Sequence, residues 1–254
     1  MDTVSLAPSA TATLRALDVG DRVVATTDHC PGNTESVGGW LSPDLERVAA
    51  LDPDTVLTAD PLQSELRDRL RARGFEVVHT EPRTLGDVYD AVKTLAGAVG
   101  EPERGGRLAT HMRERVDAVR DTVPDERPVV YCEEWPDPPM AAGNWVPDAV
   151  RAAGGAYPFL DAGERSREVS GEAVVDAAPG HAVLHYCGEG DDSEPEQFRE
   201  RWEIDPEIHV FHDDLLNQPS PKLVEGIETL AAAIHGIETS ERGVREELNW
   251  SHRG

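Results

Sequence analysis

The chain has 254 residues, and its 24 basic against 49 acidic side chains give a formal net charge of −25. This length is enough for one large α/β domain or for two lobes with separate cores. The acidic surface repels phosphate backbones, which excludes a nucleic-acid-binding protein, and with lysine only at positions 93 and 222 it is typical of proteins adapted to high salt.

The first third of the sequence alternates short apolar runs with amphipathic ones, which is typical of a parallel sheet flanked by helices. The first helix is expected to open at Pro8, with Ser9 as its cap and free backbone amides there that could meet a ligand. Strands are predicted at residues 3–6, 22–26, 55–58 and 75–79, and helices at residues 8–17, 43–51 and 62–74.

Residues 84–124 carry an almost continuous helical pattern, interrupted at Gly100 and Pro102 without a strand signal. The alternation of strands and helices then resumes. Strands are predicted at residues 128–132, 182–187 and 208–211, a short extended piece at 167–169, and helices at 147–153, 171–178, 194–202 and 222–234.

This order predicts an α/β fold with two lobes, each with a central, mostly parallel sheet flanked by helices. A long linker helix joins the lobes, and a ligand cleft lies between them. The predicted parts are an N-terminal lobe at 1–83, the linker at 84–124, a C-terminal lobe at 125–238 and a charged tail at 239–254.

An acidic, tryptophan-rich stretch at residues 131–155 follows the first strand of the second lobe. It is predicted to form a loop that faces the loop at residues 28–40 across the cleft. Large rings in such loops can line a flat macrocycle, or each can pin its own loop to the domain. The ligand-facing candidates are Asp28, Trp40, Glu133, Trp135, Asn144 and Trp145, with Glu133 ranked above Glu134 and both below Trp135, Asn144 and Trp145.

Other polar residues near predicted strand ends complete the ligand-binding candidates: His29, Cys30, Asp60, Cys187, Gly188 and Asp213, together with Pro8 and Ser9. Imidazole and thiolate groups bind first-row metals, but these side chains are dispersed, so no metal site is predicted. The alternative is that they are half-buried structural residues. Likewise, we expect His181, His185, His209 and His212 to be ordinary core or surface residues and not metal ligands. No nucleophile elbow or phosphate-binding glycine loop is present.

Over roughly residues 2 to 236 the chain resembles the helix-linked (class III) substrate-binding proteins of ABC importers, which carry cobalamin, siderophores and haem. The resemblance lies in VSLAPSATATLRALDVGDRVVATTDHC and VGGWLSPDLERVAALDPDTVLT. The cobalamin-binding branch is the most similar in EWPDPPMAAGNWVPDAVRAAGG, LHYCGEG and DDLLNQPSPKLVEG. This resemblance implies a non-catalytic, monomeric binding protein that takes a corrinoid such as cobalamin as ligand and needs no cofactor.

The resemblance also implies an ABC permease partner, contacted through one acidic residue on each lobe. Glu65 fits that role in the first lobe, whereas Asn217 occupies the expected place in the second.

The start of the chain, MDTVSLAPSATATL, has neither a basic region nor an apolar run, and no segment approaches the ~20 apolar residues of a membrane span. The sequence therefore predicts a cytoplasmic protein, or an extracellular membrane-associated one if the start is truncated. One alternative function is a siderophore- or haem-type chelate-binding protein. The other is an intracellular corrinoid-handling factor or enzyme that uses His29, Cys30, Cys132 and Cys187.

Overall fold

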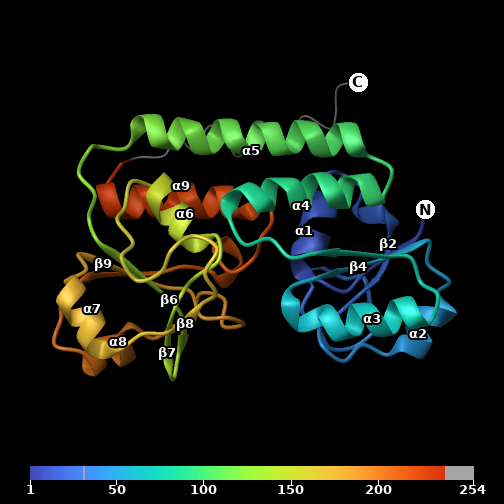
Figure 1. Ribbon diagram of the computed structural model, residues 1–254, viewed down its shortest axis with the longest axis horizontal. Coiled ribbons are helices and arrows are strands. Elements are labelled where there is room, and N and C mark those ends of the chain that lie inside the picture. Colours follow the sequence, from blue (N-terminus) through green and yellow to red (C-terminus); the bar gives the residue numbers. More distant parts are fainter. Residues whose placement is uncertain (31, 238–254) are drawn as a thin grey trace.

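The computed structural model describes residues 1–30 and 32–237, so the predicted tail at 239–254 lies outside the described residues. Two five-stranded sheets form the centres of two lobes, and one long helix runs across both (Figure 1). The predicted α/β fold, with two mostly parallel sheets flanked by helices, is confirmed. Within the described part of the chain, none of the helices has both the length and the apolar character needed to span a membrane.

The sheet of the first lobe is parallel throughout, in the order β3-β2-β1-β4-β5. Its elements are β1 (Thr3–Ser5), α1 (Pro8–Ala16), η1 (Gly20–Arg22), β2 (Val23–Thr26), β3 (Glu35–Ser36), α2 (Leu45–Ala50), β4 (Thr55–Ala59), η2 (Pro61–Gln63), α3 (Ser64–Ala72) and β5 (Val77–Thr80). All five residues of β4 are buried, and successive side chains point to opposite faces. Val56 therefore packs with the core residues of α2 and α3, and Leu57 with those of α1.

Residues 84–124 form two antiparallel helices, α4 (Leu85–Ala98) and α5 (Pro102–Thr122), instead of one continuous linker (Figure 1). A capping box between Thr84 and Asp87 starts α4. Gly100, at a φ of 76°, turns the chain into α5. The two ends of α4 pack into the cores of different lobes, lobe 1 through Leu95 and Val99 and lobe 2 through Leu85 and Val88. The helix pair is therefore part of both cores, and the predicted limits of the linker and lobes stay predictions.

The sheet of the second lobe has the order β10-β9-β6-β7-β8, in which β6, β9 and β10 are parallel and β7 and β8 are antiparallel. Its elements are β6 (Val130–Pro136), β7 (Pro139–Ala141), α6 (Val146–Ala152), β8 (Arg167–Glu168), α7 (Gly171–Ala177), β9 (His181–Leu184), α8 (Pro195–Arg201), β10 (Glu207–Val210), η3 (Asp213–Leu215) and α9 (Lys222–His235). Because β6 continues into a hairpin with β7, Glu133, Glu134 and Trp135 lie on a strand and not in the predicted loop.

Candidate ligand-binding site

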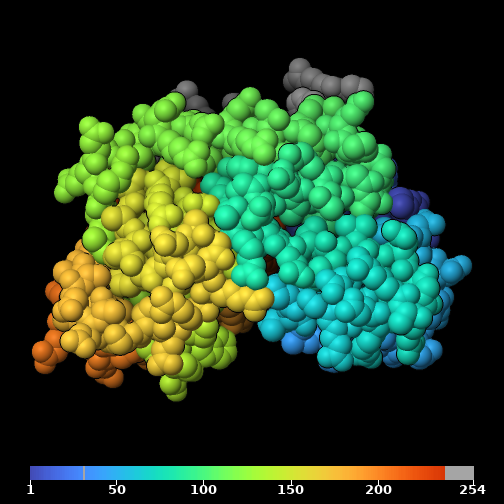
Figure 2. Space-filling view, in the orientation of Figure 1, coloured from blue at the N-terminus to red at the C-terminus, as the bar shows by residue number. Residues whose placement is uncertain are grey.

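The carboxyl ends of the parallel strands in each lobe meet at one edge of their sheet, where α/β proteins bind ligands. Asp60 directly follows β4 of the first lobe, and Glu134 lies near the end of β6 of the second. The Asp60 carboxylate makes a minor contribution to the raised pKa of Glu134, which puts the two side chains within electrostatic range of each other across the lobes. Figure 2 shows the molecular surface recessed between the lobes on the side away from α5. We call this region the interlobe edge.

Glu134 is the acidic side chain of the second lobe that faces this region. It is half-buried, and burial raises its pKa to about 7, with a further contribution from Asp60 and an opposing one from a hydrogen bond with Ser166. A carboxyl group with this pKa exchanges its proton near neutral pH, so it can accept a hydrogen bond as a carboxylate or donate one as an acid.

Glu133 has the opposite environment, and its prediction as a ligand contact is wrong. The side chain is fully buried, and both carboxylate oxygens accept hydrogen bonds from Arg201 Nη1 at 2.8 Å. Tyr186 donates a third hydrogen bond to Oε1 at 2.7 Å. An irregularity in the pairing of β6 with β7 lies between Glu133 and Trp135, and the two neighbouring glutamates on this stretch have different environments.

The three candidate tryptophans also separate by environment. Trp135, at the end of β6, is 45% exposed, whereas Trp145 is only 7% exposed and packs in the core of the second lobe. The Trp145 indole donates to the Leu216 carbonyl at 2.7 Å. Trp145 therefore pins its loop to the lobe, and its contact with a ligand stays a prediction. Trp40 is half-buried, and its indole nitrogen has no hydrogen-bond partner among the described residues.

Some exposed apolar side chains lie at or after strand ends of the two lobes. Among the described residues, five large apolar side chains are strongly exposed, and three of them follow or end strands at this edge: Leu41, Leu62 and Trp135. Exposed apolar groups beside strand ends mark a surface that can bury against an apolar ligand.

Gln63 holds the edge of the first lobe in place, and no pattern in the sequence predicts this role. Its side chain is fully buried and bonds to three separate segments: it accepts from the Ala59 amide and donates to the carbonyls of Leu6 and Trp40 at 2.8–2.9 Å. Ala59 ends β4, and Leu6 and Trp40 follow β1 and β3, so one amide side chain fixes the relative positions of three segments at the strand ends.

The other candidates of the first lobe lie on these loops. Ala7 is the N-cap of α1 and Ser9 lies within its first turn, so the prediction of Ser9 as the cap is wrong; Pro8 takes the first helical position, which its fixed φ suits. Asp28 is exposed and accepts a hydrogen bond from Ser36, and His29 beside it is exposed. Cys30 is buried against Thr27 and the Ser5 carbonyl, and its contact with a ligand stays a prediction.

In the second lobe, Asn217 organises the end of β9. It accepts a hydrogen bond from His185 Nδ1 and donates to the His185 carbonyl and to Cys187 Sγ. His185 is fully buried, and burial lowers its pKa to about 4, so the ring is neutral. Asp213 accepts from the Gly188 amide at 2.8 Å and so ties the loop after β9 to the one after β10. Cys187 and Gly188 are exposed at this edge.

Asn144, the remaining candidate, has a left-handed backbone with a φ of 53°. Its amide donates to the Glu164 carbonyl, and its own carbonyl accepts from Gly163. Its side chain is half-buried. It stays a candidate for ligand contact.

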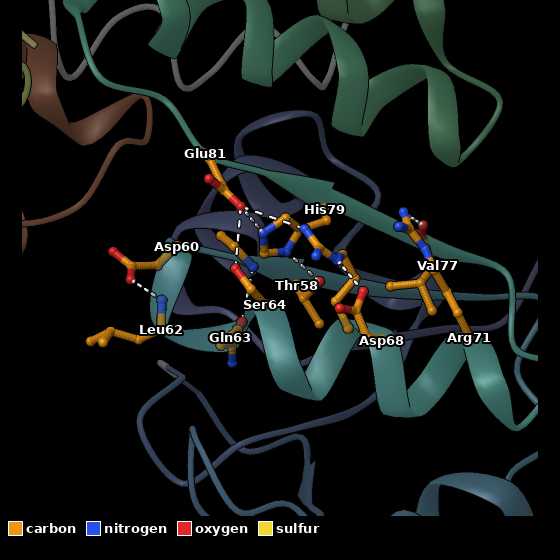
Figure 3. Close-up of polar contacts among 12 residues, drawn as sticks. Thr58, Asp60, Leu62, Gln63, Ser64, Asp68, Arg71, Val77, His79 and Glu81 are labelled. Atoms are coloured by element: carbon orange, nitrogen blue, oxygen red, sulfur yellow. Dashed lines mark hydrogen bonds and ion pairs between the residues drawn. The ribbon is translucent and has the colours of Figure 1, made fainter.

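A chain of polar contacts under Asp60 has the order of a nucleophile, a base and an acid (Figure 3). His79 Nε2 donates to Glu81 at 2.8 Å, which leaves His79 Nδ1 to accept from the Thr58 hydroxyl at 2.8 Å. Thr58, however, is fully buried, so no substrate can reach its hydroxyl. The contacts fix β4 against β5 and do not form a catalytic group.

The thiols invoked for an enzyme do not form a reactive group either. Cys132 is fully buried in β6, and burial raises the pKa of its thiol well above the usual range, so it stays protonated. Cys30 is also buried. Only Cys187 is exposed among the three cysteines.

A family model described as periplasmic binding protein matches residues 3–204. The chain belongs to this family. The vitamin B12-binding protein of Vibrio cholerae serotype O1 is 25% identical over 241 residues, which cover 89% of this chain and 86% of the relative. The members of this family are binding proteins and not enzymes, as the sequence predicted.

Solved structures of periplasmic binding proteins have the same fold. The heme-binding protein RhuT from Roseiflexus sp. RS-1 has a TM-score of 0.79 at 24% identity and covers 92% of this chain and 98% of its own. The vitamin B12 binding protein BtuF of Vibrio cholerae has a TM-score of 0.73 at 22% identity, with 92% and 96% covered. The predicted resemblance to helix-linked binding proteins is thus confirmed. The predicted cytoplasmic location is wrong, because the family is periplasmic.

Proposed function

We propose that this periplasmic binding protein takes a corrinoid such as cobalamin at the interlobe edge, and that it delivers the ligand to an ABC permease. The vitamin B12-binding relatives, which align over nearly the whole chain, support this ligand class. The chemistry of the interlobe edge supports it independently.

One observation carries the choice of ligand: Asp60 and Glu134, from opposite lobes, lie within electrostatic range of each other, and Leu41, Leu62 and Trp135 expose apolar area at or after strands of the two lobes. A corrin ring offers apolar area for Leu41, Leu62 and Trp135, and its peripheral amides donate hydrogen bonds that carboxylates accept. Haem and anionic siderophores instead bring their own negative charges, which this acidic edge repels.

Calorimetric titration of the full chain with cyanocobalamin, haem and a ferric siderophore tests the proposal. Saturable one-to-one binding of cyanocobalamin is expected, with much weaker binding of the two anionic chelates. Tighter binding of haem would overturn the choice of a corrinoid, and no binding of any of the three would overturn the class of ligand.

The substitution Trp135→Ala tests the position of the site. It removes an exposed ring at the interlobe edge, so we expect cyanocobalamin affinity to fall about tenfold or more while the unfolding midpoint stays the same. Val175→Ala, an exposed apolar residue on α7, is the matched control and should leave affinity unchanged. Equal affinities of both variants and the unsubstituted protein would place the ligand elsewhere.

Delivery to a permease would use Glu65, which is exposed in the first turn of α3. Asn217 lies where the second acidic docking residue is expected in the second lobe. Its side chain is already hydrogen-bonded to His185 and Cys187. We expect Glu65→Gln to weaken binding to the cognate permease in detergent without changing cyanocobalamin affinity. Unchanged permease binding would remove Glu65 from the docking surface.

A further inference from the structure

Two histidines and a glutamate lie together on neighbouring strands of the second lobe's sheet, at the opposite end from the interlobe edge. β9 begins at His181 and β10 begins at Glu207, and these two residues are paired in register. His209 lies two residues further along β10. Side chains in register on parallel strands, and those two apart on one strand, point to the same face. The amino ends of these strands lie away from the interlobe edge, so the group is separate from the proposed corrinoid site.

The donor atoms of the three side chains converge. His181 Nδ1 lies 3.1 Å from His209 Nε2 and 3.9 Å from a carboxylate oxygen of Glu207. One ligand atom from each residue lies within 4.8 Å of the others. Within residues 1–30 and 32–237, this is the only group of three His, Cys, Asp or Glu side chains with such spacing.

We propose that His181, Glu207 and His209 bind a divalent first-row transition-metal ion such as Zn²⁺. Two imidazole nitrogens and one carboxylate oxygen are the ligands that such ions prefer, with water completing the coordination. The ion bonds through His181 Nδ1, His209 Nε2 and a Glu207 oxygen. This site goes beyond the proposed corrinoid function and does not depend on it.

The spacing of the donors suits an ion of this size. Bonds of ~2.0–2.1 Å to each nitrogen at a tetrahedral angle place two nitrogens about 3.3 Å apart. The two imidazole nitrogens already lie near this separation, at 3.1 Å. The carboxylate must move closer, and it can, because the Glu207 side chain is 68% exposed on the edge strand. The two rings are held by the sheet and stack at 5.4 Å between centroids. The site is therefore largely formed before the ion arrives.

Titration of the full chain with ZnCl₂ in a non-chelating buffer tests the site. We expect one ion per chain and a rise in the unfolding temperature with ion concentration. His209→Gln and Glu207→Gln keep the approximate size of each side chain and should each weaken Zn²⁺ binding more than about tenfold. His111→Ala removes a histidine of α5 and should leave binding unchanged.

Two further measurements separate the site from chance binding and from misfolding. Co²⁺ bound in place of Zn²⁺ should give visible absorption bands that disappear in His181→Ala. Thermal unfolding without Zn²⁺ should stay cooperative in all three site variants, which shows that they are folded. Zn²⁺ binding that keeps its affinity in His209→Gln and His181→Ala, or no saturable binding at one ion per chain, would overturn the proposal.

Discussion

Glu133 and Glu134 are adjacent on β6, yet they have different environments. Glu133 is buried against Arg201 and Tyr186, whereas Glu134 is half-buried and within electrostatic range of Asp60 of the other lobe. The sequence shows two adjacent, equivalent glutamates, and of these two the sequence-based prediction favours Glu133 for ligand contact. The side each one faces depends on the register between β6 and its neighbours, which a single sequence does not reveal.

Glu134→Gln should stabilise the protein in a pH-dependent way. The folded-state pKa of about 7 lies above the ordinary value of 4.5, so the folded chain holds a proton that the unfolded chain loses as pH rises from 4.5 to 7. Glu134 therefore lowers stability as pH rises through this window. At pH 8 the free energy of unfolding of the variant should exceed that of the unsubstituted protein by about 1–3 kcal/mol. This difference should shrink toward pH 5. Urea unfolding at pH 5, 6.5 and 8 measures this, and a gain that is constant with pH would contradict it.

Arg201→Ala should destabilise the protein because it leaves the Glu133 carboxyl buried without its cation. The expected loss of unfolding free energy is about 3 kcal/mol or more. Arg199→Ala is the matched control on the same helix, because Arg199 pairs with Glu196 in solvent and should contribute less than about 1 kcal/mol. Urea unfolding compares the two, and similar losses would show that burial does not set the strength of the Glu133 pair.

At the scale of secondary structure, the contact between α4 and α5 depends on a glycine. A Cβ atom at Gly105 would lie 2.3 Å from Ala96 Cβ, so the two helices approach too closely for a side chain there. The adjacent Gly106 has open space around it. The sequence shows two successive glycines in a helix and does not distinguish them.

Gly105→Ala and Gly106→Ala should therefore change stability in opposite directions. Alanine is favoured over glycine inside a helix by about 1 kcal/mol, which Gly106→Ala should gain. Gly105→Ala must push α4 and α5 apart, and we expect a net loss of about 1–3 kcal/mol. Thermal unfolding of both variants measures this, and a gain in Gly105→Ala would mean that the helices can separate freely.

At the scale of the whole molecule, charged contacts hold the α4–α5 pair to both lobes. Arg22 of the first lobe bonds to the Val99 carbonyl and to Glu101 at 2.6 Å, in the turn between the helices. Arg115 of α5 makes two hydrogen bonds to Glu228 of α9, at 2.7 and 2.9 Å. Because α4 also packs in both cores, the lobes have little freedom to rotate about the connection.

Small-angle scattering should accordingly show little closure on ligand binding. A compact chain of this length has a radius of gyration of ~18 Å, and saturation with cyanocobalamin should leave it nearly unchanged. A large decrease on binding would show that the helix pair bends or that the lobes rotate about it.

The fold could be predicted from the sequence much further than the site. Helices and strands with clear apolar periodicity were found because burial repeats every two or 3.6 residues. The two-residue β3 and the three-residue β7 are too short to show a period. The electrostatic coupling of Asp60 to Glu134 and the His181–His209 pair were missed because each joins distant segments, whose approach depends on strand order and register.

Each sheet is built from one uninterrupted stretch of the chain, and only the α4–α5 pair connects them. The ribosome therefore completes all five strands of the first sheet, through Thr80, before it makes Val130 of the second. No strand of the first sheet waits for a partner synthesised later, which shortens the time during which its edges are exposed to other chains. The α4–α5 connection that limits motion between the lobes therefore also lets the two lobes fold one after the other during synthesis.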